Sequence, residues 1–519
     1  MKTSQPDTRR QTLARLLIGV LLVLVTFEAV TLAGWLTVPL FPSLNVHEES
    51  LVSAILNSEA WLFYSTSMLA PVFVVLMMFS WTPRSLLWLR RLMPRPRQKG
   101  NQLTLTVGTG RLTANSVFAH VNSVLDMAFK PDDAHSKRYW PILALSVVIA
   151  FSIAVYPSLP GVNPSGKIIG ADTSVYAAWL TDMDGHGSLL SVYQYVFFSF
   201  SDRSLSLFLM YLGWKASTIS ALQATLLLPM LLAPLLVLAT FFFMRGAGFN
   251  FRAASLASLF TAFSFHITAG MFGGFLSNWI GLIFLYLSLG CFFQSLKKRS
   301  WNLLGAAAAL QVALMLSHVY TWLMLVGALM LFLAIICVSW LKKRGDASEV
   351  KMAFAALTAN ILAYAVRNLA SGAALTPSDV AAVSQETMSL SFLQSFWWIL
   401  NRSITEYLGI SLLNPLLFFL AFTGAFALAL NGRTVNRFLA AFLAASLVPF
   451  IFGDWVMQTR ILYNLPIQIS SLLGCFMILK LVQNPFSGLK AKKLDSLLLA
   501  FIILTNLNFA FRCSFQLAS

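Results

Sequence analysis

The sequence predicts an all-α fold, a polytopic transmembrane helical bundle of about 13 spans. Two observations carry this prediction. Of the 519 residues, 58% are hydrophobic and only 11% are charged, whereas a soluble domain carries roughly 25% charged residues. Apolar runs long enough to cross a hydrocarbon core also recur along the chain. Because lipid offers the backbone no hydrogen-bond partner, these continuous runs favour helices over the alternating strands of a β-barrel.

The predicted spans are separated mostly by short polar or basic loops. The first apolar run is too long for a signal-peptide core and lacks a clear small-residue cleavage site, so we expect it to be retained. The spans fall at residues 16–36, 60–80, 139–157, 220–243, 251–269, 276–296, 301–318, 319–341, 350–370, 408–430, 437–454, 461–482 and 494–512.

The net charge of +17 follows the predicted topology. With the amino terminus in the cytoplasm, all but seven of the 36 Lys and Arg residues fall in cytoplasmic segments. The exceptions are Lys167, Arg203, Lys215, Arg367, Arg402, Arg460 and Arg512. This bias is typical of a multi-pass protein whose cytoplasmic loops are basic. We therefore expect a plasma-membrane protein with an extracytoplasmic carboxyl terminus that contacts membrane lipids and no nucleic acid.

The chain is predicted to have three parts. Residues 1–82 form a basic tail and a two-helix hairpin, and residues 83–138 form a cytoplasmic basic segment. That segment contains a short β-like stretch at 103–107 and a helix near 114–129. Residues 139–519 form a transmembrane core of about eleven spans. The four cysteines lie in or beside spans without CxxC spacing, so we interpret them as packing residues.

Two outward connections are longer than the rest, at about 157–219 and 371–407. Long connections in compact folds are often functional. Both are rich in aromatic residues, and segments 174–183 and 203–214 have an amphipathic pattern. We expect these segments to be ordered helices along the membrane interface, where aromatic residues are favoured.

The first of these connections holds the best candidate for a catalytic acid or base, Asp172. It stands in the segment Gly170-Ala-Asp-Thr-Ser-Val-Tyr-Ala-Ala-Trp-Leu-Thr-Asp-Met183, before a predicted helix. The structural alternative is an N-cap that contributes about 1 kcal/mol to helix stability. Asp202, further along the same connection, is the second candidate.

In this layout the chain resembles the GT-C superfamily of glycosyltransferases, which take sugars from polyprenyl-phosphate carriers. Members include protein O-mannosyltransferases, aminoarabinose transferases and oligosaccharyltransferase catalytic subunits. The resemblance covers residues 139–519 in layout, and in motif it rests on Asp172, Tyr176, Ala177 and Met183. The chain departs from many members at Thr173, where a second acid is common, and at Ser204-Leu205, where the family has a proline pair.

The resemblance implies transfer of a hexosyl or pentosyl group to a protein, lipid or glycan acceptor on the extracytoplasmic face. It implies Asp172 as the base, since a hydroxyl or amide acceptor needs a carboxylate within hydrogen-bond reach. Developing charge on the leaving phosphate would be stabilised by arginine. Arg367 and Arg460 are the candidates for this role, and Arg203 is a further candidate substrate-binding residue. The alternatives are that Arg460 pairs with Asp454 and that Arg367 extends to the interface.

Further candidate substrate-binding residues lie at outward helix ends. His266 and His318 would face one cavity with Asp172 if the fifth and seventh spans pack together; the alternative is that both are hydrogen-bonded core residues. The remaining candidates are Tyr176, Asn278 and Tyr463. A divalent cation, Mg²⁺ or Mn²⁺, held by Asp172 and Asp202 stays open, because such ions prefer oxygen ligands.

Two other functions are consistent with the sequence. In a transporter or flippase, Arg367 and spans interrupted by proline would line a path; those prolines are Pro229, Pro234, Pro415 and Pro466. Inverted repeats, which many transporters have, are not evident. The third function is that of a catalytically inactive subunit of an envelope complex.

Overall fold

The computed structural model describes residues 8–40, 104–107, 110–132, 136–371, 414–430, 432–446, 463–483 and 488–518. The predicted span 60–80 and most of the connection 371–407 lie outside these residues. Within them, eight helices are long and apolar enough to cross a membrane, and several shorter apolar helices accompany them. The prediction of a polytopic helical membrane protein is confirmed.

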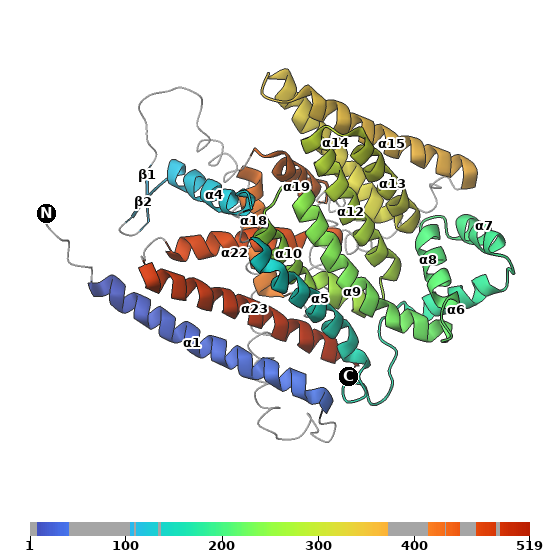
Figure 1. The fold of residues 1–519 in the computed structure, drawn as a ribbon, viewed down its shortest axis with the longest axis horizontal. Coiled ribbons are helices and arrows are strands. Elements are labelled where there is room, and N and C mark those ends of the chain that lie inside the picture. Colours follow the sequence, from blue (N-terminus) through green and yellow to red (C-terminus); the bar gives the residue numbers. More distant parts are fainter. Residues whose placement is uncertain are drawn as a thin grey trace, which may run out of the picture.

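The long and the shorter apolar helices form a bundle (Figure 1). Its two ends differ in charge. Its helices are α1 (Thr8–Thr37), α5 (Trp140–Val155), α9 (Ala221–Gly246), α10 (Phe251–Ala262), α11 (Phe265–Gly273), α12 (Leu276–Lys298), α13 (Trp301–Ser317), α14 (Val319–Leu341), α15 (Ala347–Ser371), α18 (Pro415–Leu430), α19 (Thr434–Ala445), α22 (Ile467–Gln483) and α23 (Gly488–Ala518). We call the end where α9, α12 and α14 finish the basic end, because Arg245, Lys297, Lys298, Arg299 and Lys342 lie there.

The other end, called the loop end here, carries three short helices. They are α6 (Thr173–Asp184), α7 (Leu189–Ser199) and α8 (Ser204–Lys215), and they lie together beside the first turns of α9 (Figure 1). The helices predicted at 174–183 and 203–214 are therefore present as α6 and α8. Helix α7 was not predicted. Its Ser188 cap accepts a hydrogen bond from the Ser191 N–H, a local signal that marks its start.

The basic end is covered by a small unit formed from residues 104–132. Strands β1 (Thr104–Val107) and β2 (Gly110–Thr113) pair antiparallel, and α4 (Ala114–Phe129) follows them. The Asn250 amide donates to the Met127 carbonyl at 2.7 Å, and Arg245 pairs with Asp132 at 2.7 Å. These contacts attach α4 to the connection between α9 and α10. The strand and helix expected in this segment are present.

The predicted span 251–269 is divided in two. Helix α10 ends at Ala262, and a new helix, α11, starts after Ser264. The break places His266 in the first turn of a short helix rather than in a continuous span. By contrast, α9 continues past Pro229 and Pro234 without a break, so proline alone does not reveal where these helices stop.

Helices α18 and α22 approach each other through glycine. A Cβ on Gly424 would overlap the Ser470 carbonyl oxygen, and one on Gly474 would overlap that of Leu420. Small residues permit such contact between membrane helices, where dispersion forces replace the hydrophobic effect as the source of association. This is the tightest helix contact that glycine makes in the described residues.

Candidate functional site

The loop before α6 is attached to the end of α11 by backbone hydrogen bonds. The N–H groups of Ala171 and Asp172 donate to the carbonyls of Phe272 and Gly273 at 2.9 and 3.1 Å. Gly274 has φ +63°, and a Cβ there would lie 3.0 Å from the Asp172 nitrogen. Both the left-handed conformation and this close approach require glycine. The sequence Gly273-Gly274 thus fixes the position of Asp172 relative to the helix that carries His266.

Asp172 occupies the N-cap position of α6, but its side chain makes no capping hydrogen bond. Its backbone conformation, with φ −92° and ψ 1°, differs from the extended conformation of a usual N-cap. The carbonyl of Asp172 accepts the hydrogen bond from the Tyr176 N–H at 3.0 Å. Asp172 therefore occupies the capping position, but the expected hydrogen bond from its side chain to the helix is absent. In this respect the interpretation of Asp172 as an ordinary capping aspartate is wrong.

Tyr176 connects α6 to the first turn of α12. Its hydroxyl accepts a hydrogen bond from the Ser277 N–H at 3.3 Å, and its ring packs against Trp179 at 5.2 Å. Asn278 is the next residue on α12. One turn of α6 therefore brings Asp172 and Asn278 to the same end of the bundle.

Asp202 and Arg203 form an ion pair before α8. Both Nε and Nη2 of Arg203 donate to Oδ2 of Asp202, at 2.9 and 2.7 Å. The guanidinium also lies 5.5 Å from the Trp179 ring. Burial by itself lowers the pKa of Arg203, but the charge of Asp202 and the Tyr176 hydroxyl more than offset this, so the pKa is raised. Arg203 is a permanent cation.

The same pair is attached to the junction of α13 and α14. The Val319 N–H donates to the Asp202 carbonyl at 3.1 Å, and the Ser206 hydroxyl donates to the Ser317 carbonyl at 3.0 Å. His318 lies between these two contacts in sequence. The loop-end helices thus bring Asp202, which is far from His318 in the chain, next to it.

Arg367 is buried near the end of α15, with 7% of its surface exposed. Its guanidinium lies 5.9 Å from the Tyr364 ring and within electrostatic range of Asp202. Among the residues that the structure describes, its Nε has no hydrogen-bond partner. The alternative in which Arg367 extends to the water interface is therefore not observed; the residue faces protein.

A buried polar cluster joins α12, α14 and the segment before α22. The Thr321 hydroxyl lies 2.9 Å from the side-chain oxygens of Asn278 and Asn464, and 2.7 Å from Nδ1 of His318. The Thr321 N–H also donates to Nδ1, so in the neutral ring the proton is on Nε2. One hydroxyl carries one hydrogen, so at least one of the two amides must present its nitrogen to Thr321.

We expect Thr321→Val to destabilise the protein by about 1–3 kcal/mol, because it removes the hydroxyl while leaving buried polar partners unsatisfied. Thermal unfolding in detergent measures the effect. Thr26→Val is the matched control, since the Thr26 hydroxyl donates to the Leu22 carbonyl of its own helix on an exposed face of α1. Equal stability of the two variants would show that the cluster contributes nothing.

His266 and Tyr463 form a second, separate contact. The Tyr463 hydroxyl donates to the His266 carbonyl at 2.6 Å, and Nδ1 of His266 lies 3.3 Å from the Ser264 hydroxyl. Both side chains are fully buried. Among the described residues, the two histidines thus take part in different contacts, His318 with Thr321 and His266 with Tyr463 and Ser264.

The remaining predicted residues fall into two classes. Arg460 and Asp454 lie outside the described residues. Within the described part of the chain, no group of three or more His, Cys, Asp or Glu side chains is arranged to hold a metal ion, and a cation held by Asp172 and Asp202 alone stays a prediction. Sequence reasoning missed Thr321 and Asn464. The only available signal was the spacing from His318 to Thr321, which matches that of a helix cap and its third residue.

The fold and these contacts define a polytopic helical membrane protein with a charged, aromatic and amide-rich cluster at one end of its bundle. No known family model matches the sequence, and no curated protein matches it. Among solved structures, the chain is similar to the crystal structure of the oligosaccharyltransferase of Archaeoglobus fulgidus in complex with zinc and sulfate. The identity is 12% and the TM-score 0.42, with 71% of this chain and 53% of that chain covered. The chain thus spans about half the length of that protein.

Proposed function

We propose that this protein transfers a sugar from a polyprenyl-phosphate carrier to an acceptor at the loop end of its bundle. The observation that carries the proposal is the arrangement of one acid and two arginines there. Asp172 begins α6, Arg203 lies before α8, and Arg367 lies in the last turns of α15. These residues are distant in sequence, and the fold brings their elements to one end of the helices (Figure 1).

Asp172 acts as the base in this proposal. The acceptor oxygen or nitrogen attacks the anomeric carbon and forms the new glycosidic bond. The bond from that carbon to the phosphate oxygen breaks, and its electron pair leaves with the phosphate. The acceptor proton passes to the Asp172 carboxylate. That carboxylate makes no capping hydrogen bond to its own helix. Accepting the proton would therefore not break a bond that stabilises α6.

Arg203 and Arg367 bind the phosphate of the carrier. Arginine holds phosphate through paired N–H donors, and charge that develops on the leaving group strengthens these bonds. Arg367 is suited to this role because its Nε lacks a partner among the described residues and Asp202 is within electrostatic range. Asp202 holds the Arg203 guanidinium in position. We assign Asp202 this positioning role in place of direct catalysis.

The direction of the bundle in the membrane belongs to the same proposal. If the basic end faces the cytoplasm, as the positive-inside rule predicts, the loop end and its acids face the extracytoplasmic side. The amino terminus then lies in the cytoplasm and the end of α23 outside. Polyprenyl carriers present their sugar at a membrane surface, where α6–α8 lie.

The test is reconstitution of the purified full chain in liposomes with a panel of labelled polyprenyl-phosphate sugars. We expect loss of label from the lipid and its appearance on an added acceptor extract. Liposomes without protein are the control. Movement of a solute across the same liposomes with no transfer would favour a transporter. Neither activity, together with co-purification of an active partner, would favour an inactive subunit.

A further inference from the structure

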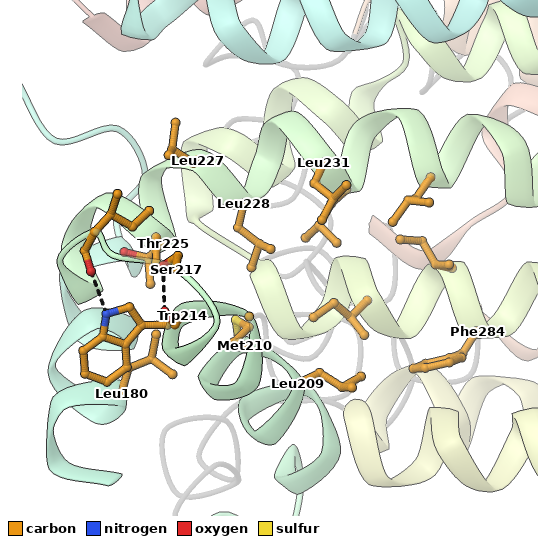
Figure 2. A pocket seen from close by; sticks show the side chains of 17 residues that line it. Leu180, Leu209, Met210, Trp214, Ser217, Thr225, Leu227, Leu228, Leu231 and Phe284 are labelled. Carbon is orange, nitrogen blue, oxygen red and sulfur yellow. Dashed lines mark hydrogen bonds between the residues drawn. The ribbon is translucent and has the colours of Figure 1, made fainter. Parts of the chain in front are cut away.

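An apolar cavity of about 480 Å³ lies between α8, α9 and α12 (Figure 2). Its wall includes Leu209 and Gly213 on α8, Leu228 and Leu231 on α9, and Phe284 on α12. Asp172, Asp202, Arg203 and Arg367 are not among its lining residues, so the cavity is separate from the candidate site.

The length of the cavity matches one leaflet of a bilayer. Its lining on α9 runs from Ala224 to Leu235, a separation of eleven residues, which is about 17 Å along a helix. The hydrocarbon core of a bilayer is about 30 Å thick, so one leaflet is about 15 Å. Because α9 begins at the loop end, the cavity runs from that interface toward the middle of the membrane.

The two ends of the cavity differ in chemistry. Near the interface, the Trp214 indole donates to the Ile219 carbonyl at 3.0 Å and the Ser217 hydroxyl to the Trp214 carbonyl at 2.6 Å (Figure 2). Lys215 lies 4.9 Å from the Trp214 ring, is 44% exposed, and forms an ion pair with Asp184 at 2.6 Å, so both a cationic and an anionic group lie at this end. The deep end, at Leu235 and Phe284, is apolar. A cavity with a polar end at the interface and an apolar end in the membrane is suited to a lipid, whose charged headgroup would lie at the interface and whose acyl chain would lie among the apolar residues.

The cavity is also continuous with the lipid-facing surface. Leu209, Leu227 and Leu231 line it and are 40%, 46% and 58% exposed. In a membrane, those exposed side chains meet hydrocarbon rather than water. A hydrocarbon chain can therefore enter sideways from the bilayer, without crossing a polar surface.

We propose that this cavity binds an acyl chain of a bilayer phospholipid, with its phosphate at Lys215. The lipid is a different molecule from any sugar carrier whose phosphate lies at Arg203. Arg203 precedes the first residue of α8, and Trp214 lies eleven residues later, about 16 Å along the helix. The inference does not depend on the proposed function. The bound chain would fill the space between α8 and α9, and so support the helix that follows Asp202 and Arg203.

Gly213→Leu tests the proposal by filling the cavity. A Cβ on Gly213 meets nothing within 4 Å, so the new side chain occupies open space without a clash. Gly305→Leu is the matched control, because Gly305 is also helical and equally open but lies on α13, outside the cavity. Leu228→Trp is a second filling variant that does not change a glycine.

The measurement is native mass spectrometry of the full chain released from nanodiscs of palmitoyl-oleoyl phosphatidylethanolamine. We expect the wild type and Gly305→Leu to retain one phospholipid, and both filling variants to retain it at least about tenfold less. A parallel sample of delipidated protein receives polyprenyl phosphate instead. No retained phospholipid in the wild type, or equal retention in the filling variants, would overturn the proposal. Retention of polyprenyl phosphate alone, lost in Gly213→Leu, would also overturn it.

Discussion

Asp172→Asn is expected to reduce sugar transfer by about 10²–10⁴-fold, the usual contribution of a general base. The amide has almost the same shape as the carboxylate but cannot accept the acceptor's proton. The Asp172 N–H bond to Gly273 and the Tyr176 bond to its carbonyl involve only the backbone, so they remain. The rate should therefore fall without loss of folding or of carrier binding. Transfer from a labelled carrier and binding of polyprenyl phosphate are measured on the same preparation.

Asp182→Asn is the matched control for this variant. It makes the same substitution on the same helix, and the Asp182 carboxylate accepts a hydrogen bond from Tyr195 on an exposed surface. We expect its transfer rate to equal that of the wild type. Wild-type transfer by a folded Asp172→Asn protein would remove Asp172 from the mechanism. An equal loss in both variants would indicate a general effect of charge on α6.

Gly424→Ala and Gly474→Ala are expected to give the largest losses of stability. Each new methyl group would overlap a backbone carbonyl on the facing helix, and backbone cannot move aside as a flexible side chain can. Overpacking of this kind costs about 1–3 kcal/mol, and more where helices must separate. The two positions face each other across α18 and α22, so their effects should not be additive. Thermal unfolding of the purified chain measures the loss.

Gly305→Ala provides the comparison for both glycine variants. The position is helical and open, so replacing glycine should stabilise the helix by about 0.5–1 kcal/mol. The sign of the change in stability thus distinguishes the gain from higher helix propensity, expected at Gly305, from the loss caused by overlap with the facing helix, expected at Gly424 and Gly474. A stabilising effect of Gly424→Ala similar to that of Gly305→Ala would contradict the close approach of α18 and α22.

The sequence by itself determined the membrane class, the positions of the described long helices and the difference in charge between the two ends. These properties depend on local composition: apolar length decides which segments cross lipid, and basic residues collect where helices finish, as at Lys297-Lys298-Arg299. It also located the helix that follows Asp172, because amphipathic spacing is a local signal. For the same reason it placed Asp172 and Arg203 in one long connection between spans.

Only the tertiary structure decided which side chains meet. The pairing of Asp202 with Arg203 beside Val319, and the cluster of Thr321, Asn278 and Asn464, join segments separated by as many as 143 residues. Hydrophobic periodicity predicts which face of a helix is buried, but it does not identify the residues that this face contacts. The division of the span at Ser264 was equally hidden, since an apolar run can hold a break that tertiary contacts satisfy. A polar group inside a bundle is stabilised only by hydrogen-bond partners that the packing of the helices brings to it. The sequence around the group does not reveal which distant residues those partners are.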